Sequence, residues 1–452
     1  MPITSNSFPA IRLGLFFVLA LLINCVMDGL PRTFLGDQIC VVPFTLTFLI
    51  AFYYFLHPEK LSAPLGSRLG RANWRSCLWL SSLFVVAGYF IILAEAHSFH
   101  QYGYQLYPVA AACLFGAVAL ALVFAQSRQQ MSARSLLFIV LACYFAIEIF
   151  SIVSFPPDIR RSDMLAMIQA AGADMARGHN PYHYFTWPTE WAFCPYLPAL
   201  IGAYIPGVLL HLDLRWLATA YMLAGASLIF WATRSEHRRV VAATLSTFLL
   251  GNYLIFRHEL YLQIHWLVLI IMSICLCRRW LFAAAVAMGT ALAISQLTLA
   301  IFPFLLLHAW QKESFKKALQ VTTVLLGTAA CIISPYAITN PRGMFYGTVE
   351  RINNISLVRA RPMNLAYWIA HFIQPNQLRW VQFAALVVLF GYAILKNRCR
   401  DAAGCLAMMM VAFLSFIMMS IFLDGYFYLT FLVLVLAYLC TVNKWWRETA
   451  AD

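Results

Sequence analysis

Apolar stretches long enough to cross a lipid bilayer recur along nearly the whole chain, and they limit its fold more than any other feature. Residues 11–30, 109–125 and 136–155 are clear examples. A backbone surrounded by hydrocarbon must satisfy its hydrogen bonds internally, so stretches of this kind are expected to be α-helices. The composition agrees, because 62% of the residues are hydrophobic and 11% are charged, whereas about a quarter are charged in soluble proteins. The sequence therefore predicts an all-α polytopic membrane protein.

The net charge of +13 arises mainly from short basic clusters between the apolar stretches. Clusters in such positions are typical of cytoplasmic loops, and they explain the charge without a nucleic-acid partner. Residues 57–75, 234–239 and 277–279 are assigned to the cytoplasm on this basis. The assignment predicts about 14 crossings with both termini in the cytoplasm. The first apolar run is expected to stay in the protein as a helix and not to be cleaved off as a signal peptide.

Two apolar stretches depart from the pattern of single crossings. Residues 196–212 contain two prolines, which favour a short or broken helix that dips into the membrane. Residues 280–310 are too long for one crossing and have basic residues at both ends. They are predicted to form a hairpin of two short helices that turns near Ser295 and Gln296.

Cysteine usage indicates neither a disulfide framework nor a metal centre. The 12 cysteines are scattered, mostly inside apolar stretches, and no paired spacing resembles a zinc site. They are expected to be small buried apolar residues. Acids in outer loops could hold a divalent metal, but no ligand spacing indicates one, so no cofactor is predicted.

Residues 154–206 form the longest polar interruption of the chain. Because the preceding apolar stretch is assigned to an outward crossing, they are expected on the non-cytoplasmic side. A short amphipathic helix in the membrane interface is predicted within residues 160–177. Its apolar stripe consists of Met164, Ile168, Ala171 and Met175. Gly178 is expected to end this helix, and Asn180-Pro181 to turn the chain.

Asp163 falls at the start of this predicted helix. The simplest interpretation is a helix cap, because a carboxylate there accepts hydrogen bonds from the first backbone N–H groups. The same position stabilises the ionised carboxylate at neutral pH, which suits a general base, so the two interpretations are compatible. Asp158, which follows two prolines, is the second candidate.

Several short motifs, in their order along the chain, resemble GT-C superfamily glycosyltransferases. The first outer loop carries Asp163, then Gly178-His179-Asn180-Pro181-Tyr182, then Cys194-Pro195-Tyr196-Leu197-Pro198. The resemblance is closest to polyprenyl-phosphate-mannose-dependent mannosyltransferases of bacteria, and Asp163 matches the acid of that family by position. Leu262-Gln263-Ile264-His265 stands where the family has a Gly-Gln-x-Asn step, with Leu262 in place of the glycine. Ser295-Gln296, followed by Pro303, resembles its Lys-Gln step, with Ser295 in place of the lysine.

The resemblance covers residues 147–395 and implies a GT-C-like helical bundle with catalytic loops on the non-cytoplasmic side. The implied organisation has N-terminal helices in residues 1–135 and C-terminal helices in residues 398–452. Between them, residues 136–397 form the catalytic core, with outer loops 154–206 and 339–362. The implied reaction moves a sugar from a polyprenyl-phosphate donor to a hydroxyl of a lipid, glycan or protein acceptor.

The resemblance also implies roles for individual residues. Inversion at the sugar carbon requires one acid, which is expected to be Asp163, with Asp158 as the alternative. The leaving phosphate requires cations and hydrogen-bond donors. The candidates for that role are Arg257, His258, Gln263, His265, Gln296, Arg351, Arg359 and Arg361. The candidates for contact with the sugar or acceptor are Asn180, Tyr182, Trp191 and Tyr196.

Each of these roles has a plainer alternative. The arginines of the second outer loop also suit acidic lipid headgroups, and the aromatic residues also suit an interfacial belt. His265 also suits a hydrogen-bonded core position. For the whole protein, the rival functions are a membrane transporter or lipid flippase, and an O-antigen polymerase or ligase. The expected location is the bacterial inner membrane with the active site on the periplasmic face, and the alternative is the endoplasmic reticulum.

Overall fold

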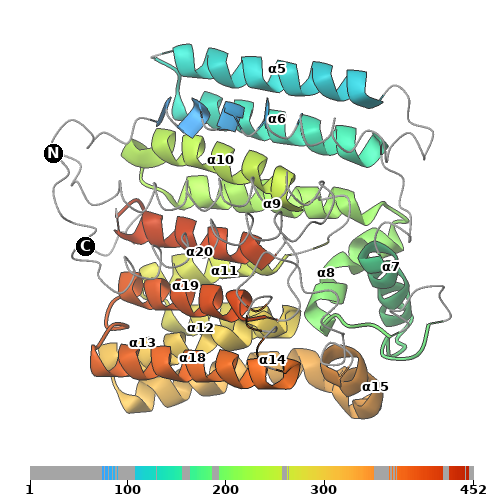
Figure 1. Ribbon diagram of the computed structural model, residues 1–452, viewed down its shortest axis with the longest axis vertical. Coiled ribbons are helices and arrows are strands. Elements are labelled where there is room, and N and C mark those ends of the chain that lie inside the picture. The colour runs from blue at the N-terminus through green and yellow to red at the C-terminus, as the bar shows by residue number, and fades with distance from the viewer. Residues whose placement is uncertain are drawn as a thin grey trace. The chain divides into compact units, whose positions relative to one another are not determined.

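The computed structural model describes residues 107–128, 130–154, 163–185, 193–256, 264–350, 374–420 and 427–442, together with scattered residues between 74 and 89 and at 262, 366, 369, 372 and 444–446. These ranges are helical, with two isolated β-bridges and no longer strands, so the predicted all-α class is confirmed for them (Figure 1). Five of the described helices are long and apolar enough to cross a membrane: Val109–Ser127, Ala133–Ser154, Leu214–Ala232, Phe315–Thr339 and Gln377–Leu395. The total of about 14 crossings stays a prediction.

The chain divides into two compact units that alternate along the sequence. Unit 1 contains Met1–Pro156, Met222–Glu259 and Val442–Arg447, and unit 2 contains Pro157–Tyr221, Leu260–Thr441 and Glu448–Asp452. The division falls within helix α9 (Leu214–Ala232). The predicted domains, in contrast, are consecutive blocks of sequence.

Unit 1 contains α5 (Tyr107–Ser127), α6 (Ala133–Ser154) and α10 (Arg238–Phe256), with α6 packed against both α5 and α10. Its basic residues gather at one end. The guanidinium of Arg238 lies 4.8 Å from the Trp231 ring centroid, and that of Arg134 lies 5.6 Å from the same ring. The basic residue at the start of α6 and the basic residue at the start of α10 therefore lie against the same ring.

Unit 2 is built around α12 (Leu281–Ile294), which packs against α11 (His265–Cys277) and α14 (Phe315–Thr339). Small residues permit this close packing. A side chain at Gly289 of α12 would place its Cβ 2.4 Å from the backbone oxygen of Leu325 in α14. Around this centre lie α13 (Phe302–Lys312), α18 (Pro375–Leu395), α19 (Ala402–Met418) and α20 (Phe427–Val442).

The predicted hairpin in residues 280–310 is confirmed. The α12 helix ends at Ile294, and the hydroxyl of Ser295 accepts a hydrogen bond from Leu297 N at 3.3 Å, which starts the short 3-10 helix η3 (Gln296–Ala300). The returning helix α13 leads to Lys317 in α14, whose Nζ lies 4.1 Å from the Phe282 ring centroid at the start of α12. The chain has therefore come back to the end from which α12 began.

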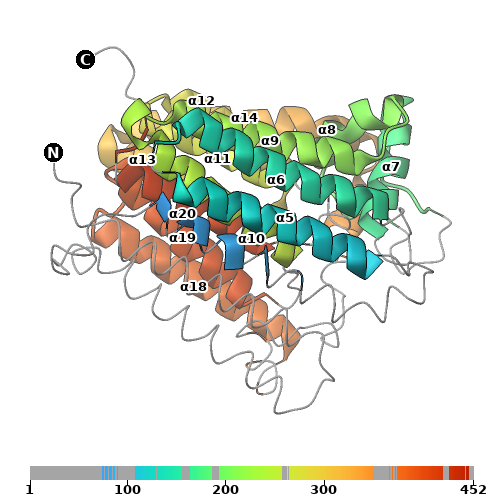
Figure 2. The same ribbon diagram turned by 90° about the horizontal axis from the view of Figure 1, so that it is seen from above.

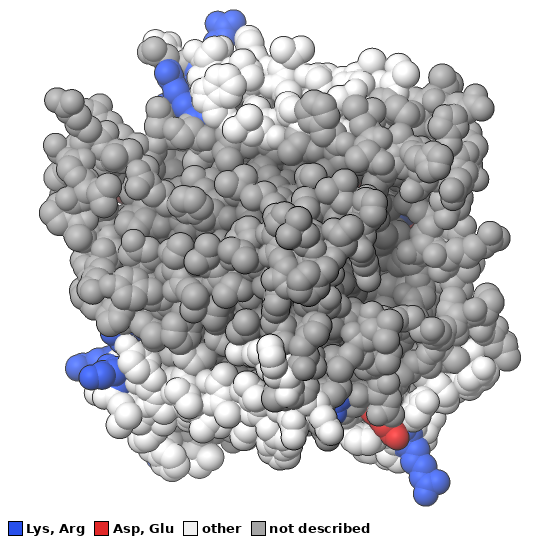
Figure 3. Space-filling view, viewed as in Figure 1, with Lys and Arg blue, Asp and Glu red and all other residues white. Residues whose placement is uncertain are grey.

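That end of unit 2 is called the basic end here. His308 Nδ1 lies 2.6 Å from the Cys399 backbone oxygen, which joins α13 to the turn between α18 and α19. The Lys and Arg residues of the basic end are Arg278, Arg279, Lys312, Lys316, Lys317, Lys396, Arg398 and Arg400, and its acids are Glu313 and Asp401. On the face of the molecule drawn in Figure 3, the described charged side chains that can be seen lie near the margins.

The opposite end of unit 2 is called the loop end. It carries α7 (Asp163–Ala176), α8 (Pro198–Leu209) and α15 (Pro341–Phe345), and α7 lies crosswise to the long helices of the unit (Figures 1 and 2). The helix predicted within residues 160–177 is present as α7, while its place in the membrane interface stays a prediction. Of the predicted apolar stripe, Met164, Ile168 and Ala171 are buried and Met175 is half-buried. The helix is followed by Gly178 at a φ of +77°, a backbone conformation that glycine adopts without steric cost.

The short helix predicted within residues 196–212 is present as α8, while its dip into the membrane stays a prediction. Pro198 stands in the first turn of α8, where its missing N–H costs nothing, and Pro206 lies inside the helix. The helix has 12 residues, which is shorter than a bilayer crossing needs.

Candidate functional site

The loop end of unit 2 brings together three segments that are far apart in the sequence. Met164 and Leu165, at the start of α7, share a buried cluster with Leu262 and Ile264, at the start of α11, and with Ile294, at the end of α12. The backbone N–H of Leu262 also donates to the Met164 sulfur at 3.4 Å. The first residue of α7, Asp163, therefore begins its helix beside the segments that carry the other two predicted motifs.

His265 is the first residue of α11 and is 3% exposed. Its Nε2 lies 2.6 Å from Thr298 Oγ1 and its Nδ1 lies 3.2 Å from Thr430 Oγ1. Thr298 uses its one hydroxyl proton to donate to the Ala291 backbone oxygen at 3.0 Å. Nε2–H must then donate to Thr298. His265 thus ties α11 to η3 and α20, which favours the hydrogen-bonded core role over direct phosphate contact.

Gln296 links the hairpin break to the second outer loop. Its side-chain Nε2 donates to the backbone oxygen of Thr348 at 3.0 Å. Thr348 lies in η4 (Tyr346–Glu350), a π-helical turn, a rare conformation that is frequent at functional sites. This bond fixes the start of the loop that continues into Arg351, so Gln296 acts in the described structure as a support for that loop.

Asn180 fastens the first outer loop to the end of α14. Its Nδ2 donates to the Tyr336 backbone oxygen at 2.8 Å and to Thr339 Oγ1 at 2.6 Å. Its Oδ1 accepts from the backbone N–H of Tyr182 at 2.9 Å. Both ends of the amide are therefore used within the fold.

Tyr182 completes this connection, and its side chain is fully enclosed. Its hydroxyl donates to the Tyr196 backbone oxygen at 2.8 Å, and its own backbone oxygen accepts from Asn340 Nδ2 at 2.7 Å. Burial raises the pKa of the Tyr182 hydroxyl well above its usual value, with a smaller effect from Cys194. The set Asn180, Tyr182, Asn340 and Gly343 is called the loop clasp below.

Glycine is required at two points where these segments touch, Gly343 of the loop clasp and Gly347 just after it. A Cβ at Gly343 would lie 2.1 Å from the Tyr182 backbone oxygen, and one at Gly347 would lie 2.4 Å from the Cys194 backbone oxygen. The two predicted outer loops therefore come into contact at their backbones. Sugar contact by Asn180, Tyr182 or the half-buried Tyr196 stays a prediction, while their observed contacts hold the loops together.

The remaining predicted site residues lie outside the described residues. They are Asp158, Trp191, Arg257, His258, Gln263, Arg351, Arg359 and Arg361. For Asp163 the structure describes the backbone, which begins α7, but not the side chain. Among the residues that the structure does describe, no group of three or more His, Cys, Asp or Glu side chains is arranged to hold a metal ion.

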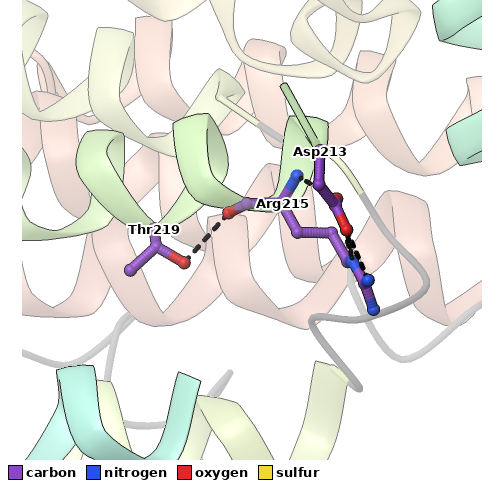
Figure 4. Close-up of polar contacts among 3 residues, drawn as sticks. All are labelled: Asp213, Arg215 and Thr219. Atoms are coloured by element: carbon purple, nitrogen blue, oxygen red, sulfur yellow. Dashed lines mark hydrogen bonds and ion pairs between the residues drawn. The ribbon is translucent and has the colours of Figure 1, made fainter. Parts of the chain in front are cut away.

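One charged pair at the loop end escaped the sequence analysis (Figure 4). Asp213 directly precedes α9, and its Oδ1 accepts from the Arg215 backbone N–H at 3.0 Å. Both carboxylate oxygens also lie 2.9 Å from Arg215 Nε. Thr219 Oγ1 donates to the Arg215 backbone oxygen at 3.0 Å, one turn further along. In the sequence this pair is an Asp-x-Arg step immediately before an apolar stretch. Such a step is common at the ends of membrane helices, so it does not by itself indicate a functional site.

No family model, curated protein or solved structure matches this chain. Its function is therefore argued from its own residues and their arrangement.

Proposed function

We propose that the protein is an integral-membrane glycosyltransferase that moves a sugar from a polyprenyl-phosphate donor to an acceptor hydroxyl at the loop end of unit 2. One observation carries this proposal: the starts of α7 and α11 and the end of α12 meet in one buried cluster. The motifs that resemble the GT-C superfamily stand on these three segments.

In the proposed reaction, Asp163 is the general base. Its carboxylate takes the proton of the acceptor hydroxyl as that oxygen attacks the anomeric carbon of the sugar. The bond between this carbon and the phosphate oxygen breaks, and its electron pair stays on the phosphate, so the configuration inverts. Arginines of the second outer loop stabilise the charge on the leaving phosphate, and the Gln296 bond to Thr348 supports the start of that loop.

The distribution of charge supports a non-cytoplasmic site. Lys and Arg outnumber acids at the basic end of unit 2, as in cytoplasmic loops. The loop end would then face the other side, where a polyprenyl chain in the bilayer presents its phosphate at the surface. We place the protein in a bacterial inner membrane, with its active site on the periplasmic face.

The test compares Asp163→Asn with wild type in a transfer assay. The donors are synthetic polyprenyl phosphates carrying different sugars, and native membrane lipids and glycans are supplied as acceptors. Loss of the base is expected to lower the rate on the order of 10²–10⁴-fold. The matched control is Asp174→Asn at the other end of α7, where the carboxylate accepts from His183 Nε2 at 2.8 Å and an amide can replace it. Full activity of Asp163→Asn would move the base to Asp158, and absence of transfer from every donor would count against the enzyme class.

One observation favours a transporter or flippase as the second candidate. Glu148, in α6, is 2% exposed within a candidate membrane span. Buried acids in such positions often belong to ion or substrate pathways. Reconstituted vesicles test this directly, because a transporter would move lipid or solute across them and lose that activity in Glu148→Gln.

A further inference from the structure

Two arginines of unit 1 lie against the ring of one exposed tryptophan. The guanidinium of Arg238, at the start of α10, is 4.8 Å from the Trp231 ring centroid, and that of Arg134, at the start of α6, is 5.6 Å from it. Trp231 stands near the end of α9 and is 48% exposed. The set Arg134, Trp231 and Arg238 is called the arginine–tryptophan cluster. Side-chain contacts therefore hold two positive charges close together at the surface of unit 1.

The described Lys and Arg residues of unit 1 far outnumber its described acids, which are Glu148 and Glu236. Glu236 lies 3.2 Å from His237 Nε2, and Glu148 lies further along α6, inside a candidate membrane span. Neither arginine of the cluster forms an ion pair with a described residue. Like charges held close together repel, so a bound anion would stabilise this arrangement. The described Lys and Arg residues of unit 1 are Arg75, Arg128, Arg134, Arg234, Arg238, Arg239 and Lys444.

Arg238 gives a second, independent sign of an anion. It is 7% exposed, and its Nε donates to the Thr233 backbone oxygen at 3.3 Å. Its Nη2 is enclosed and has no hydrogen-bond partner among the described residues. Contact with the faces of Phe230 and Trp231 offsets part of the cost of burying the charge. An enclosed N–H group of a cation is nevertheless normally hydrogen-bonded, so Arg238 keeps a donor that an anionic oxygen can satisfy.

The same pattern continues beside the cluster. Arg239 follows Arg238 directly in α10, and its guanidinium lies 5.8 Å from the Trp74 ring centroid. The guanidinium of Arg75 lies 5.6 Å from that ring. Cations and tryptophans thus alternate along this end of unit 1.

The cluster stands at the ends of two candidate membrane spans, Ala133–Ser154 and Leu214–Ala232. Arg134 is next to the first residue of one span, and Trp231 is next to the last residue of the other. Tryptophan prefers the depth of the lipid headgroups, and the ends of spans lie at that depth. The anions present there are lipid phosphates, which basic pockets between membrane helices bind.

We propose that the arginine–tryptophan cluster, with the neighbouring Arg239, binds the headgroup phosphate of an anionic phospholipid. The guanidinium groups contact the phosphate oxygens through charge-assisted hydrogen bonds. Trp231 holds both guanidinium groups beside the headgroup, with its ring at the boundary between headgroup and acyl chains. This lipid site goes beyond the proposed sugar transfer and does not depend on it.

The experiment measures lipid binding by thermal unfolding of the full chain in detergent. Phosphatidylglycerol, phosphatidylcholine with the same acyl chains, and soluble glycerol phosphate are each titrated, and an apparent Kd is taken from the rise in Tm. Only phosphatidylglycerol is expected to raise Tm in a saturable way at low concentration. Arg134→Gln is expected to weaken this binding about fivefold, the usual contribution of one basic residue near an anionic membrane. Trp231→Leu is expected to weaken it as well, although the net charge does not change.

The controls separate a defined site from general attraction to positive charge. Arg400→Gln removes an exposed arginine of the basic end of unit 2, with the same change in charge, and is expected to bind as wild type does. Trp310→Leu is the control for Trp231→Leu, because Trp310 is similarly exposed at 46%. Arg134 and Trp231 are exposed, so their variants should fold even if Arg238→Gln does not.

Three results would overturn the proposal. The first is wild-type affinity in both Arg134→Gln and Trp231→Leu. The second is equal weakening by Arg400→Gln, which would show diffuse attraction of anionic lipid to all basic residues. The third is equal stabilisation by phosphatidylcholine or by glycerol phosphate, which would show that the protein does not select an anionic lipid headgroup.

Discussion

Asn340 donates a hydrogen bond from Nδ2 to the Tyr182 backbone oxygen at 2.7 Å, and this bond joins the two predicted outer loops of unit 2. The Oδ1 of the same amide accepts from the Gly343 backbone N–H at 3.0 Å, so it also caps α15. Asn180 makes the reciprocal connection from the first loop to the end of α14. Two asparagines on different segments thus hold the first and second outer loops as one structure at the proposed active site.

The first prediction concerns the coupling between these two asparagines. Asn180→Ala and Asn340→Ala each leave buried backbone groups without partners and are expected to cost about 1–3 kcal/mol of stability. Because both side chains bind the turn at Tyr182, the double variant should lose less than the sum of the single losses. A double-mutant cycle by chemical unfolding in detergent measures this. Thr323→Ala serves as the control, since that exposed hydroxyl bonds only to its own helix at the Leu319 oxygen. Strict additivity would show that the two bonds act independently.

The second prediction concerns the backbone contact at Gly343. Gly343→Ala would place a Cβ 2.1 Å from the Tyr182 backbone oxygen, so the two loops must separate. The expected loss of stability is about 1–3 kcal/mol, and transfer activity should fall with it. Gly327→Ala in α14 is the matched control, because nothing lies within 4 Å of the Cβ built there. In a helix, that change is expected to stabilise by about 0.5–1 kcal/mol. Equal behaviour of the two variants in thermal unfolding would contradict the clasp.

The elements of unit 2 were more predictable than the bonds between them. The spacing of Met164, Ile168 and Ala171 predicts α7, and the length of residues 280–310 predicts a break near Ser295, because both depend on local pattern and on the thickness of a bilayer. The bond from Asn180 to Tyr336 crosses 156 residues, and no local pattern specifies it. Tertiary packing alone decides which of several polar residues meet.

The same limit applies to the candidate site. The motif predicts that Tyr182 contacts the sugar, whereas the hydrogen bonds described for it are with Tyr196 and Asn340. The pair of Asp213 and Arg215 has no sequence pattern that distinguishes it, because a charged residue beside a membrane segment has many ordinary explanations.

The third prediction concerns the Cys194 thiol, which is fully buried under Gly347. Burial raises its pKa from the ordinary 9.0 to about 12, although a hydrogen bond to the Tyr196 backbone lowers it slightly. At pH 8 the thiol should therefore resist alkylation by a water-soluble maleimide, and Gly347→Ala should accelerate labelling by displacing the loops. Mass spectrometry of the labelled peptide measures both rates, with protein unfolded in SDS as the reference. Fast labelling of the folded wild type would contradict the burial.

The same pKa shift predicts a pH dependence of stability. The folded pKa of Cys194 lies above its unfolded value, so the folded protein holds the proton more tightly. The contribution of the protonated thiol is fully present below pH 9 and is lost as the pH rises from 9 towards 12. Cys194→Ser and Cys194→Ala should unfold with a weaker pH dependence than wild type across that window. Identical pH profiles for wild type and Cys194→Ala would show that this thiol does not contribute.

The last prediction separates a structural from a catalytic role for His265. Thr298→Val removes the acceptor of the 2.6 Å bond from Nε2 and leaves a buried N–H group without a partner. The expected loss of stability is about 1–3 kcal/mol. Thr430→Val removes only the longer 3.2 Å bond at Nδ1 and should cost less. If His265 acts as the tie between α11 and η3, transfer activity per folded molecule should be the same in both variants and in wild type. The opposite result would be a large fall in both the transfer rate and the donor affinity of folded Thr298→Val. That result would assign His265 to binding the phosphate, because without the bond to Thr298 the imidazole could no longer hold the tautomer that faces the substrate.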